Sequence, residues 1–159
     1  MDIQIQRANL ALDAVHLSEM DVKIFDADAF AFVEDWNGLE CFWVIVDGVR
    51  IGCFALRHNS TMAHDYDDEY PYVPGSLYIV STGLLPEFQG KGIGSFVKQW
   101  QIDYAKSHGF RVINTNCRRS NEASYRLNTK FGFVYIGQVP DYYEDPTEDA
   151  LVLELRLKP

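Results

Sequence analysis

Alternating and continuous runs of hydrophobic residues predict strands along most of the chain. The alternation in DIQIQRA predicts a first strand, and two apolar runs on either side of Asp47-Gly48 predict a hairpin over residues 40–59. Further strands are expected over residues 76–85, 110–117, 133–139 and 150–157, the last two joined by the loop PDYYEDPTED.

Three other stretches have the spacing of amphipathic helices. Residues 9–36 are predicted to be helical in two pieces, with a cap at Ser18. Residues 92–108 predict a helix whose apolar face is formed by Ile93, Phe96, Val97, Trp100 and Tyr104. Residues 120–131 predict a helix capped by Ser120 or Asn121 and ended at Gly132. The order of elements is an α+β pattern with a mostly antiparallel sheet.

The composition fits one globular domain over residues 1–159, with 47% hydrophobic residues. No apolar run reaches the roughly 18 residues of a membrane span, and the N-terminal segment has no signal-peptide pattern, so a cytoplasmic protein that does not bind membranes is predicted. The spacing of Cys41, Cys53 and Cys117 predicts buried thiols, with no metal site.

The net charge of the chain limits the classes of partner that it is expected to bind. The net charge of −9 argues against nucleic-acid binding, which requires a basic surface, and is compatible with a cationic partner such as an amine. The long loop over residues 59–75 is acidic and aromatic. It either attracts an ammonium group, through Asp67, Asp68 and Glu69, or is a solvated loop, and both interpretations stay open.

A glycine-rich segment, QGKGIG at residues 89–94, joins the strand over residues 76–85 to the helix over residues 92–108. Glycine weakens a helix, but small residues allow an anion to approach the free N–H groups at a helix N-terminus. The segment matches neither the P-loop nor the dinucleotide-binding pattern. It therefore predicts a different phosphate-binding loop.

Two motifs together resemble the GCN5-related N-acetyltransferase (GNAT) family. The first is LLPEFQGKGIG, with Leu84, Pro86, Glu87, Gln89, Gly92 and Gly94 at the motif positions. The second is NEASYRLNTKFGF, with Asn121, Ser124, Gly132 and Phe133. The resemblance implies the GNAT fold, a mixed, mostly antiparallel seven-stranded sheet flanked by helices, and acetyl-CoA as cosubstrate.

The resemblance also assigns residues to acetyl-CoA. It implies that backbone N–H groups of the glycine loop hold the pyrophosphate and that the N–H of Leu84 faces the thioester carbonyl. The helix over residues 120–131 is expected to meet the pantetheine. The residues so implicated are Leu84, Leu85, Gln89, Gly90, Lys91, Gly92, Ile93, Gly94, Ser95, Asn121, Ser124 and Asn128.

Asparagine occupies both positions where relatives carry acid–base groups. Asn128 stands at the position of a tyrosine beside the CoA sulfur, where its amide could bind the thiolate, and Tyr125 one turn earlier is an alternative acid. Asn116 stands at the position of a glutamate base. Tyr125, Asn128 and Leu84 are therefore the candidate catalytic residues, and the base is sought among His58, His64, Asp65, Asp67, Asp68 and Glu69.

The closing hairpin is similar to that of ribosomal-protein alanine N-acetyltransferases, which implies that Tyr142 and Tyr143 hold an acceptor peptide. The leading hypothesis is an N-acetyltransferase in which a primary amine, such as a peptide or protein N-terminus, attacks acetyl-CoA directly. A polyamine or amino-sugar acceptor is the alternative that the acidic loop favours. A non-catalytic acyl-CoA-binding module is the alternative that Asn116 and Asn128 favour, and a homodimer is left open.

Overall fold

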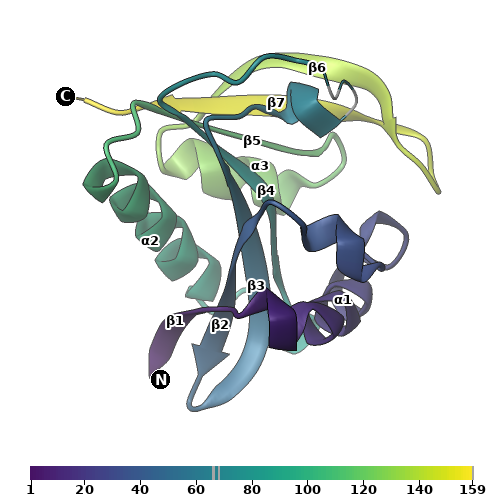
Figure 1. The fold of residues 1–159 in the computed structure, drawn as a ribbon, viewed down its shortest axis with the longest axis vertical. Coiled ribbons are helices and arrows are strands. Elements are labelled where there is room, and N and C mark those ends of the chain that lie inside the picture. Colours follow the sequence, from purple (N-terminus) through teal and green to yellow (C-terminus); the bar gives the residue numbers. More distant parts are fainter. Residues whose placement is uncertain (66, 68, 159) are drawn as a thin grey trace. The chain divides into compact units, whose positions relative to one another are not determined.

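The computed structural model describes residues 1–65, 67 and 69–158 (Figure 1). Asp68, one of the candidate acceptor-binding residues, lies outside this part of the chain. Among the described residues, no helix combines the length and the apolar character needed to cross a membrane.

The described residues form a seven-stranded sheet with the strand order β1-β2-β3-β4-β5-β7-β6. The pairs β1–β2, β2–β3, β5–β7 and β6–β7 are antiparallel, and β4–β5 is parallel. This confirms the mixed, mostly antiparallel sheet. The strands are β1 Ile3–Arg7, β2 Glu40–Val46, β3 Val49–His58, β4 Ser76–Leu84, β5 Val112–Arg118, β6 Val134–Tyr143 and β7 Glu148–Arg156.

One compact unit comprises Met1–Leu56 and Ser81–Val97. Its β2–β3 hairpin turns at Asp47 and Gly48, whose φ angles of 49° and 83° suit a tight hairpin turn. Its main helix is α1 Leu10–Phe25, followed by the short 3-10 helices η1 Asp26–Asp28 and η2 Val33–Trp36.

The predicted cap at Ser18 is wrong. Helix α1 begins after Asn9, whose side chain accepts a hydrogen bond from the Ala11 N–H, and it continues through Ser18. Ser18 is buried, and its hydroxyl accepts a 2.8 Å hydrogen bond from Trp36 Nε1. The serine therefore anchors η2 to α1. Its hydroxyl serves this tertiary contact and does not cap a helix.

The other compact unit comprises Arg57–Val80 and Lys98–Pro159. In Figure 1, β5, β7 and β6 of this unit run side by side. Alternate residues of a strand point to opposite faces. One face meets η3 Met62–Asp65, because Met62 packs with Ala150, and the other meets α3 Glu122–Lys130, because Cys117 is hydrogen-bonded to Ser124.

The closing hairpin is longer than predicted. Strand β6 continues to Tyr143 and β7 already starts at Glu148, so Tyr142 and Tyr143 lie on a strand instead of in a loop. A shift in register between Val139 and Tyr143 accommodates the proline at position 140. The strand keeps the two tyrosines next to the sheet face that η3 covers.

Helix α2 Ile93–Ser107 follows the 3-10 helix η4 Pro86–Phe88. Ile93, Val97 and Tyr104 are buried as the helical pattern predicts. Phe96 is 42% exposed, whereas the polar side chains of Lys98 and Gln101 are buried. The predicted apolar face is thus rotated, and two polar residues occupy buried positions of the helix.

Candidate active site

The glycine loop is open and leads directly into a helix. Gly90 and Gly92 have φ angles of 74° and 83°, and no atom lies within 4 Å of a Cβ placed on either. The left-handed backbone, and not crowding, therefore requires glycine here. Ile93, Gly94 and Ser95 form the first turn of α2, where the N–H groups of a helix lack intrahelical acceptors and attract anions.

Hydrogen bonds hold the residues before the loop. Gln89 Nε2 donates to the Leu84 carbonyl at 3.0 Å, which folds the loop back on the end of β4. The Leu85 N–H donates to the Ile51 carbonyl at 2.8 Å. The Lys91 ammonium lies 5.7 Å from the centre of the Phe88 ring. The segment expected to bind pyrophosphate therefore has a defined backbone.

Strands β4 and β5 pair over only a few residues. The parallel pairs run from Ser76–Val112 to Tyr78–Asn114. Beyond them, the Thr115 hydroxyl donates to the Ile79 carbonyl at 3.1 Å, so a side chain takes the place of a ladder bond. The ladder between these two parallel strands therefore covers only their first residues.

A network of five polar side chains lies on the sheet face that η3 covers. The Tyr78 hydroxyl donates to Asp65 Oδ2 at 2.7 Å and also lies 2.7 Å from Asn116 Oδ1. Asn116 Nδ2 donates to the Tyr143 hydroxyl at 2.7 Å, and the Tyr142 hydroxyl donates to Asp65 Oδ2 at 3.0 Å. The single proton of Tyr78 thus has two competing acceptors.

The surroundings of this network are apolar. Tyr78 packs with Met62 and Ala150, and partly buried hydrophobic side chains complete the cluster. Burial raises the pKa of Tyr78 and of Tyr142, so both hydroxyls stay protonated near neutral pH. The Asp65 side chain is 17% exposed and forms a 3.1 Å ion pair with Arg57 Nη1. Asp65 is therefore a carboxylate at the edge of a low-dielectric site.

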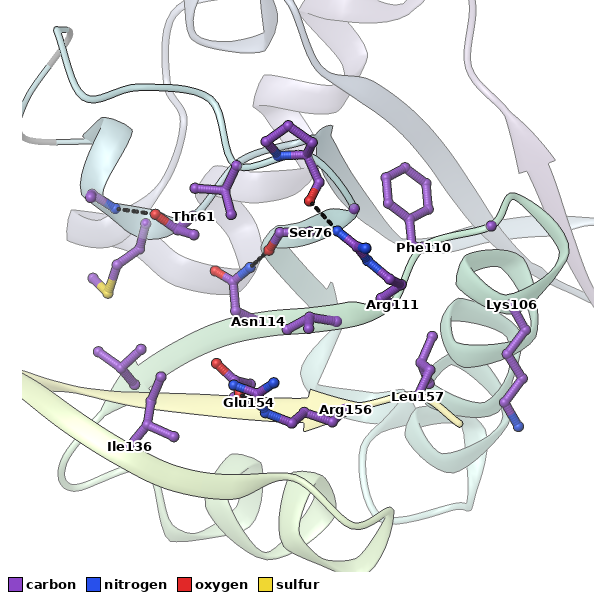
Figure 2. A pocket seen from close by; sticks show the side chains of 18 of the residues that line it. Thr61, Ser76, Lys106, Phe110, Arg111, Asn114, Ile136, Glu154, Arg156 and Leu157 are labelled. Atoms are coloured by element: carbon purple, nitrogen blue, oxygen red, sulfur yellow. Dashed lines mark hydrogen bonds and ion pairs between the residues drawn. The ribbon is translucent and has the colours of Figure 1, made fainter. Parts of the chain in front are cut away.

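Asn116 links two tyrosines, whereas Asn114 on the same face is structural. Asn114 is buried, and its amide nitrogen lies 2.9 to 3.2 Å from the Ser76 hydroxyl and the Ser60 and Leu77 carbonyls. These bonds tie the start of the 59–75 loop to the sheet. Figure 2 shows the bond between Asn114 and Ser76.

Helix α3 presents Ser124 and Asn128 on one face. Asn121 caps the helix by accepting a 3.1 Å hydrogen bond from the Ser124 N–H. Asn128 is buried, and its Nδ2 donates to the Ser124 carbonyl at 2.9 Å. Within the described part of the chain, Asn128 Oδ1 has no hydrogen-bond partner. A buried acceptor without a donor is costly, so the free energy of this position is less favourable than that of a fully paired amide.

The surroundings of Tyr125 differ from those of Ser124 and Asn128. It lines a separate cavity of about 360 Å³ together with Arg119, Glu122, Arg126 and Leu151. Its backbone N–H donates to the Asn121 carbonyl within the helix start. Asn128, and not Tyr125, is therefore the residue that shares the Ser124 face.

A buried lysine was missed by the sequence pattern. Lys98 is 4% exposed, and its ammonium lies 5.1 Å from the centre of the Phe133 ring. Burial lowers its pKa to about 7, although the nearby Cys117 opposes this shift. Burial raises the pKa of the Cys117 thiol. The only signal in the sequence is the place of Lys98 directly beside Val97, at the border of the apolar face.

The candidate bases in and beside the acidic loop differ in their contacts. Asp65 reaches the network, whereas Asp67 Oδ1 accepts a 3.0 Å hydrogen bond from the Glu69 N–H in a local turn. His64 Nδ1 lies 2.7 Å from the Ser60 hydroxyl, and His58 Nε2 lies 2.9 Å from the Tyr104 hydroxyl. Asp65 is thus the candidate base that the structure brings to Asn116 through Tyr78.

Arg118 orders the hairpin that carries Tyr143. It forms a 3.0 Å ion pair with Glu148 and donates to the Pro146 and Glu144 carbonyls at 2.8 and 2.6 Å. Its guanidinium also lies 4.8 Å from the centre of the Tyr143 ring. These contacts hold the tyrosine in position beside Asn116.

The chain is similar to known proteins. Residues 11–133 match the model of the acetyltransferase (GNAT) family. A protein of Bacillus subtilis (strain 168) that carries the name ribosomal protein bS18-alanine N-acetyltransferase is 21% identical over 147 residues, which are 92% of this chain and 95% of that protein.

Solved structures show the same fold. The ribosomal-protein-S18-alanine N-acetyltransferase from Escherichia coli has a TM-score of 0.80 at 16% identity, covering 99% of this chain and 96% of that chain. A GNAT family acetyltransferase from Elizabethkingia anophelis with acetyl-CoA bound has a TM-score of 0.76 at 16% identity, covering 98% of each chain.

Proposed function

Because this chain belongs to the acetyltransferase (GNAT) family, it is an acetyltransferase, and we propose that it transfers the acetyl group of acetyl-CoA to the α-amine of a peptide or protein. A relative named for an N-terminal alanine supports a peptide acceptor, as do the hydrogen bonds of Tyr142 and Tyr143 within the polar network. Membership of the family weighs against a non-catalytic binding module.

In this proposal, acetyl-CoA is held through its phosphates and its amides. The backbone from Gln89 to Ser95 binds the pyrophosphate, with Lys91 beside it. Asn121, Ser124 and Asn128 belong to the part of α3 that meets the pantetheine, and Asn128 is bonded to the Ser124 carbonyl. The N–H of Leu84 donates to the oxygen of the tetrahedral intermediate, next to Leu85.

Direct attack requires a neutral amine. The acceptor ammonium gives one proton to Asp65, and the amine nitrogen then forms a bond to the thioester carbonyl carbon. The carbon–sulfur bond breaks, and the thiolate takes the second proton that the nitrogen loses. The products are the N-acetylated acceptor and free CoA thiol, with one proton left on Asp65 for release to water.

The observation that carries the proposal is the set of hydrogen bonds around Tyr78, which can rearrange to accommodate a proton on Asp65. With Asp65 ionised, Tyr78 must choose between Asp65 and Asn116 as acceptors, each at 2.7 Å. A protonated Asp65 donates to the Tyr78 oxygen, which frees the Tyr78 proton for Asn116 Oδ1. Asn116 then donates to Tyr143, so every hydrogen bond of the chain has one donor and one acceptor.

Removing the carboxylate tests the proposed base. We expect Asp65→Asn to lower kcat with an N-terminal peptide by about 10²–10³-fold, because general-base catalysis contributes that much, with acetyl-CoA affinity unchanged. Asp103→Asn is the control, since Asp103 is exposed on α2 and accepts a hydrogen bond from Gln99. Equal kcat for Asp65→Asn and the control would remove Asp65 from the mechanism.

An assay of the CoA thiol released with each acceptor distinguishes the candidate acceptors. Peptides with free N-termini are expected to outcompete polyamines and aminoglycosides, because Asp67 is engaged in its own turn and Tyr142 lies beside Asp65 in the network. Faster turnover of a polyamine would favour the acidic-loop alternative. No thiol release from any acceptor, with acetyl-CoA still bound, would favour a binding module.

The glycine loop has a matched control elsewhere in the chain. Gly92 and Gly48 share a φ of 83° and have open space at the Cβ position. The two alanine variants therefore carry the same backbone strain, but only Gly92→Ala adds a methyl group where the pyrophosphate is expected. We predict at least about tenfold weaker acetyl-CoA binding for Gly92→Ala alone, measured by calorimetry. Equal affinities would place the phosphates elsewhere.

A further inference from the structure

A cavity of about 970 Å³ lies on the same sheet face as the polar network. Its walls come from the segment over residues 61–63, from residues 73–76 and from β5, β6 and β7. In Figure 2, Thr61 and Ile136 lie toward one end and Arg111, Leu157 and Lys106 toward the other. Such a volume is large enough for a small molecule or for several residues of a peptide.

The charge of this cavity is opposite to that of the protein. Its lining contains Lys106, Arg111, Arg156 and Lys158, but Glu154 is its only acidic residue within the described part of the chain. The whole protein has 14 basic and 23 acidic residues. A cleft lined by charges of one sign concentrates ligands of the other sign. The cavity therefore favours an anion in spite of the net charge of −9.

The cationic groups retain free donor capacity. Arg156 Nε pairs with Glu154 at 3.0 Å, and its side chain is 80% exposed. Arg111 uses one donor of its guanidinium on the Pro74 carbonyl, at 3.2 Å. Because a guanidinium has five N–H donors, both arginines can still bind a carboxylate or phosphate oxygen.

The other end of the cavity adjoins the proposed site of acetyl transfer. Met62, Val139 and Val152 line the cavity and also pack around Tyr78, Tyr142 and Tyr143. Met62 belongs to η3, whose last residue is Asp65. An occupant of the cavity is thus in contact with the apolar residues that surround the network.

The strand register sets the distance between the two ends. Val152 is paired with Asn116, and Arg156 is paired with Val112. Arg156 lies four residues further along β7 on the same face, which corresponds to about 13 Å at the rise of an antiparallel strand. In an extended peptide whose N-terminus lies at the network, the Cα of the fourth residue is three steps, about 10 Å, from the first, and its side chain spans the remaining distance to the arginines.

We propose that the acceptor occupies this cavity and carries an anionic group about 13 Å from its amine. The inference rests on the proposed function and adds a substrate class, an acidic peptide whose carboxylate at the fourth position binds Arg111 and Arg156. The apolar walls accept the residues between the amine and the carboxylate.

Three pentapeptide amides test the charge requirement. They share an N-terminal alanine and differ only in Glu, Gln or Lys at the fourth position. We expect kcat/KM for the Glu peptide to exceed that for the Gln peptide by about tenfold, because charge-assisted hydrogen bonds are the strong ones, with the Lys peptide the slowest. Arg111→Gln and Arg156→Gln are expected to abolish the Glu–Gln difference. Arg7→Gln is the control, an exposed arginine paired with Glu40.

Direct binding of the same peptides separates this inference from the proposed function. Turnover that does not depend on the fourth residue would overturn the inference and leave the acetyltransferase proposal intact. Tighter binding of the Glu peptide that depends on both arginines, without turnover, would support the cavity and contradict the proposed acceptor chemistry. If neither binding nor turnover depends on charge, the cavity does not hold the acceptor.

Discussion

At the scale of single residues, Asn116 and Asn128 have different surroundings. Asn116 joins Tyr78 to Tyr143, next to the carboxylate of Asp65. Asn128 is held by Ser124 and keeps an unpaired carbonyl. In our proposal, Asn116 is connected through the Tyr78 hydroxyl to the carboxylate of Asp65, and Asn128 binds the cosubstrate. Neither needs to transfer a proton itself.

Lys98 allows a prediction about stability and pH. Its pKa is about 7 in the folded protein, against about 10.4 for an unperturbed lysine, so between these values the unfolded chain binds more protons than the folded one. Stability therefore rises with pH over this range, and the cost of the buried charge is complete only below pH 7. We predict that Lys98→Met increases the free energy of unfolding at pH 7 by about 2–5 kcal/mol, because the variant removes the cost of burying the charge that the pKa difference expresses.

Urea denaturation at pH 7 and pH 9.5 checks this sign. The gain of Lys98→Met over the unmodified protein should shrink at the higher pH, where the unmodified protein no longer buries a charge. Lys106→Met, at an exposed position of the same helix, should show no such trend. A gain for Lys98→Met that is equal at both pH values would mean that packing alone explains it.

At the scale of elements, glycines decide how closely β3 and β4 approach each other and α1. A Cβ on Gly52 would lie 2.3 Å from the Gly83 carbonyl oxygen, and a Cβ on Gly83 would lie 2.7 Å from Ile24 and Phe25 of α1. Gly83 precedes Leu84, the proposed oxyanion donor. The position of that donor therefore depends on tight packing between backbones.

Gly52→Ala tests this dependence. Its methyl group meets a backbone oxygen that cannot rotate away, so we expect a loss of about 1–3 kcal/mol in the free energy of unfolding, as in other overpacked cores. We also expect a lower kcat, because the end of β4 must shift.

Gly137→Ala is the matched variant. Gly137 also lies in a strand, β6, but no atom lies within 4 Å of its Cβ position. Thermal unfolding and thiol release should show that variant to be as stable and as active as the unmodified protein. Equal stability for Gly52→Ala would indicate that β3 and β4 can separate at little cost.

At the scale of the whole molecule, the distribution of charge matters more than its sum. The net charge of −9 suggested a cationic partner, as ammonium acceptors are. The folded chain instead collects four basic side chains around one cavity, from residue 106 to residue 158. Composition has no information on which charges become neighbours, so the anionic part of the proposed acceptor could not be inferred from it.

The sequence alone determined the features that depend on neighbouring residues. Local hydrophobic periodicity placed all seven strands and the helices α2 and α3, because strands and helices expose side chains with different repeats. The Asp47-Gly48 turn followed from backbone sterics, whereas the left-handed φ angles of Gly90 and Gly92 were found only in the structure. These local rules were sufficient to identify the family through its two motifs.

Only the tertiary structure decided which distant residues meet. Asp65, Asn116 and Tyr142 lie in three separate elements, and no local pattern distinguishes Asp65 from the other acids of its loop. Ser18 was misplaced and Lys98 was missed, because burial depends on what packs against these residues and helical period cannot show this. Catalytic geometry, buried charge and the cationic cavity arise from long-range contacts, whereas elements and turns arise from steric rules acting within a few residues.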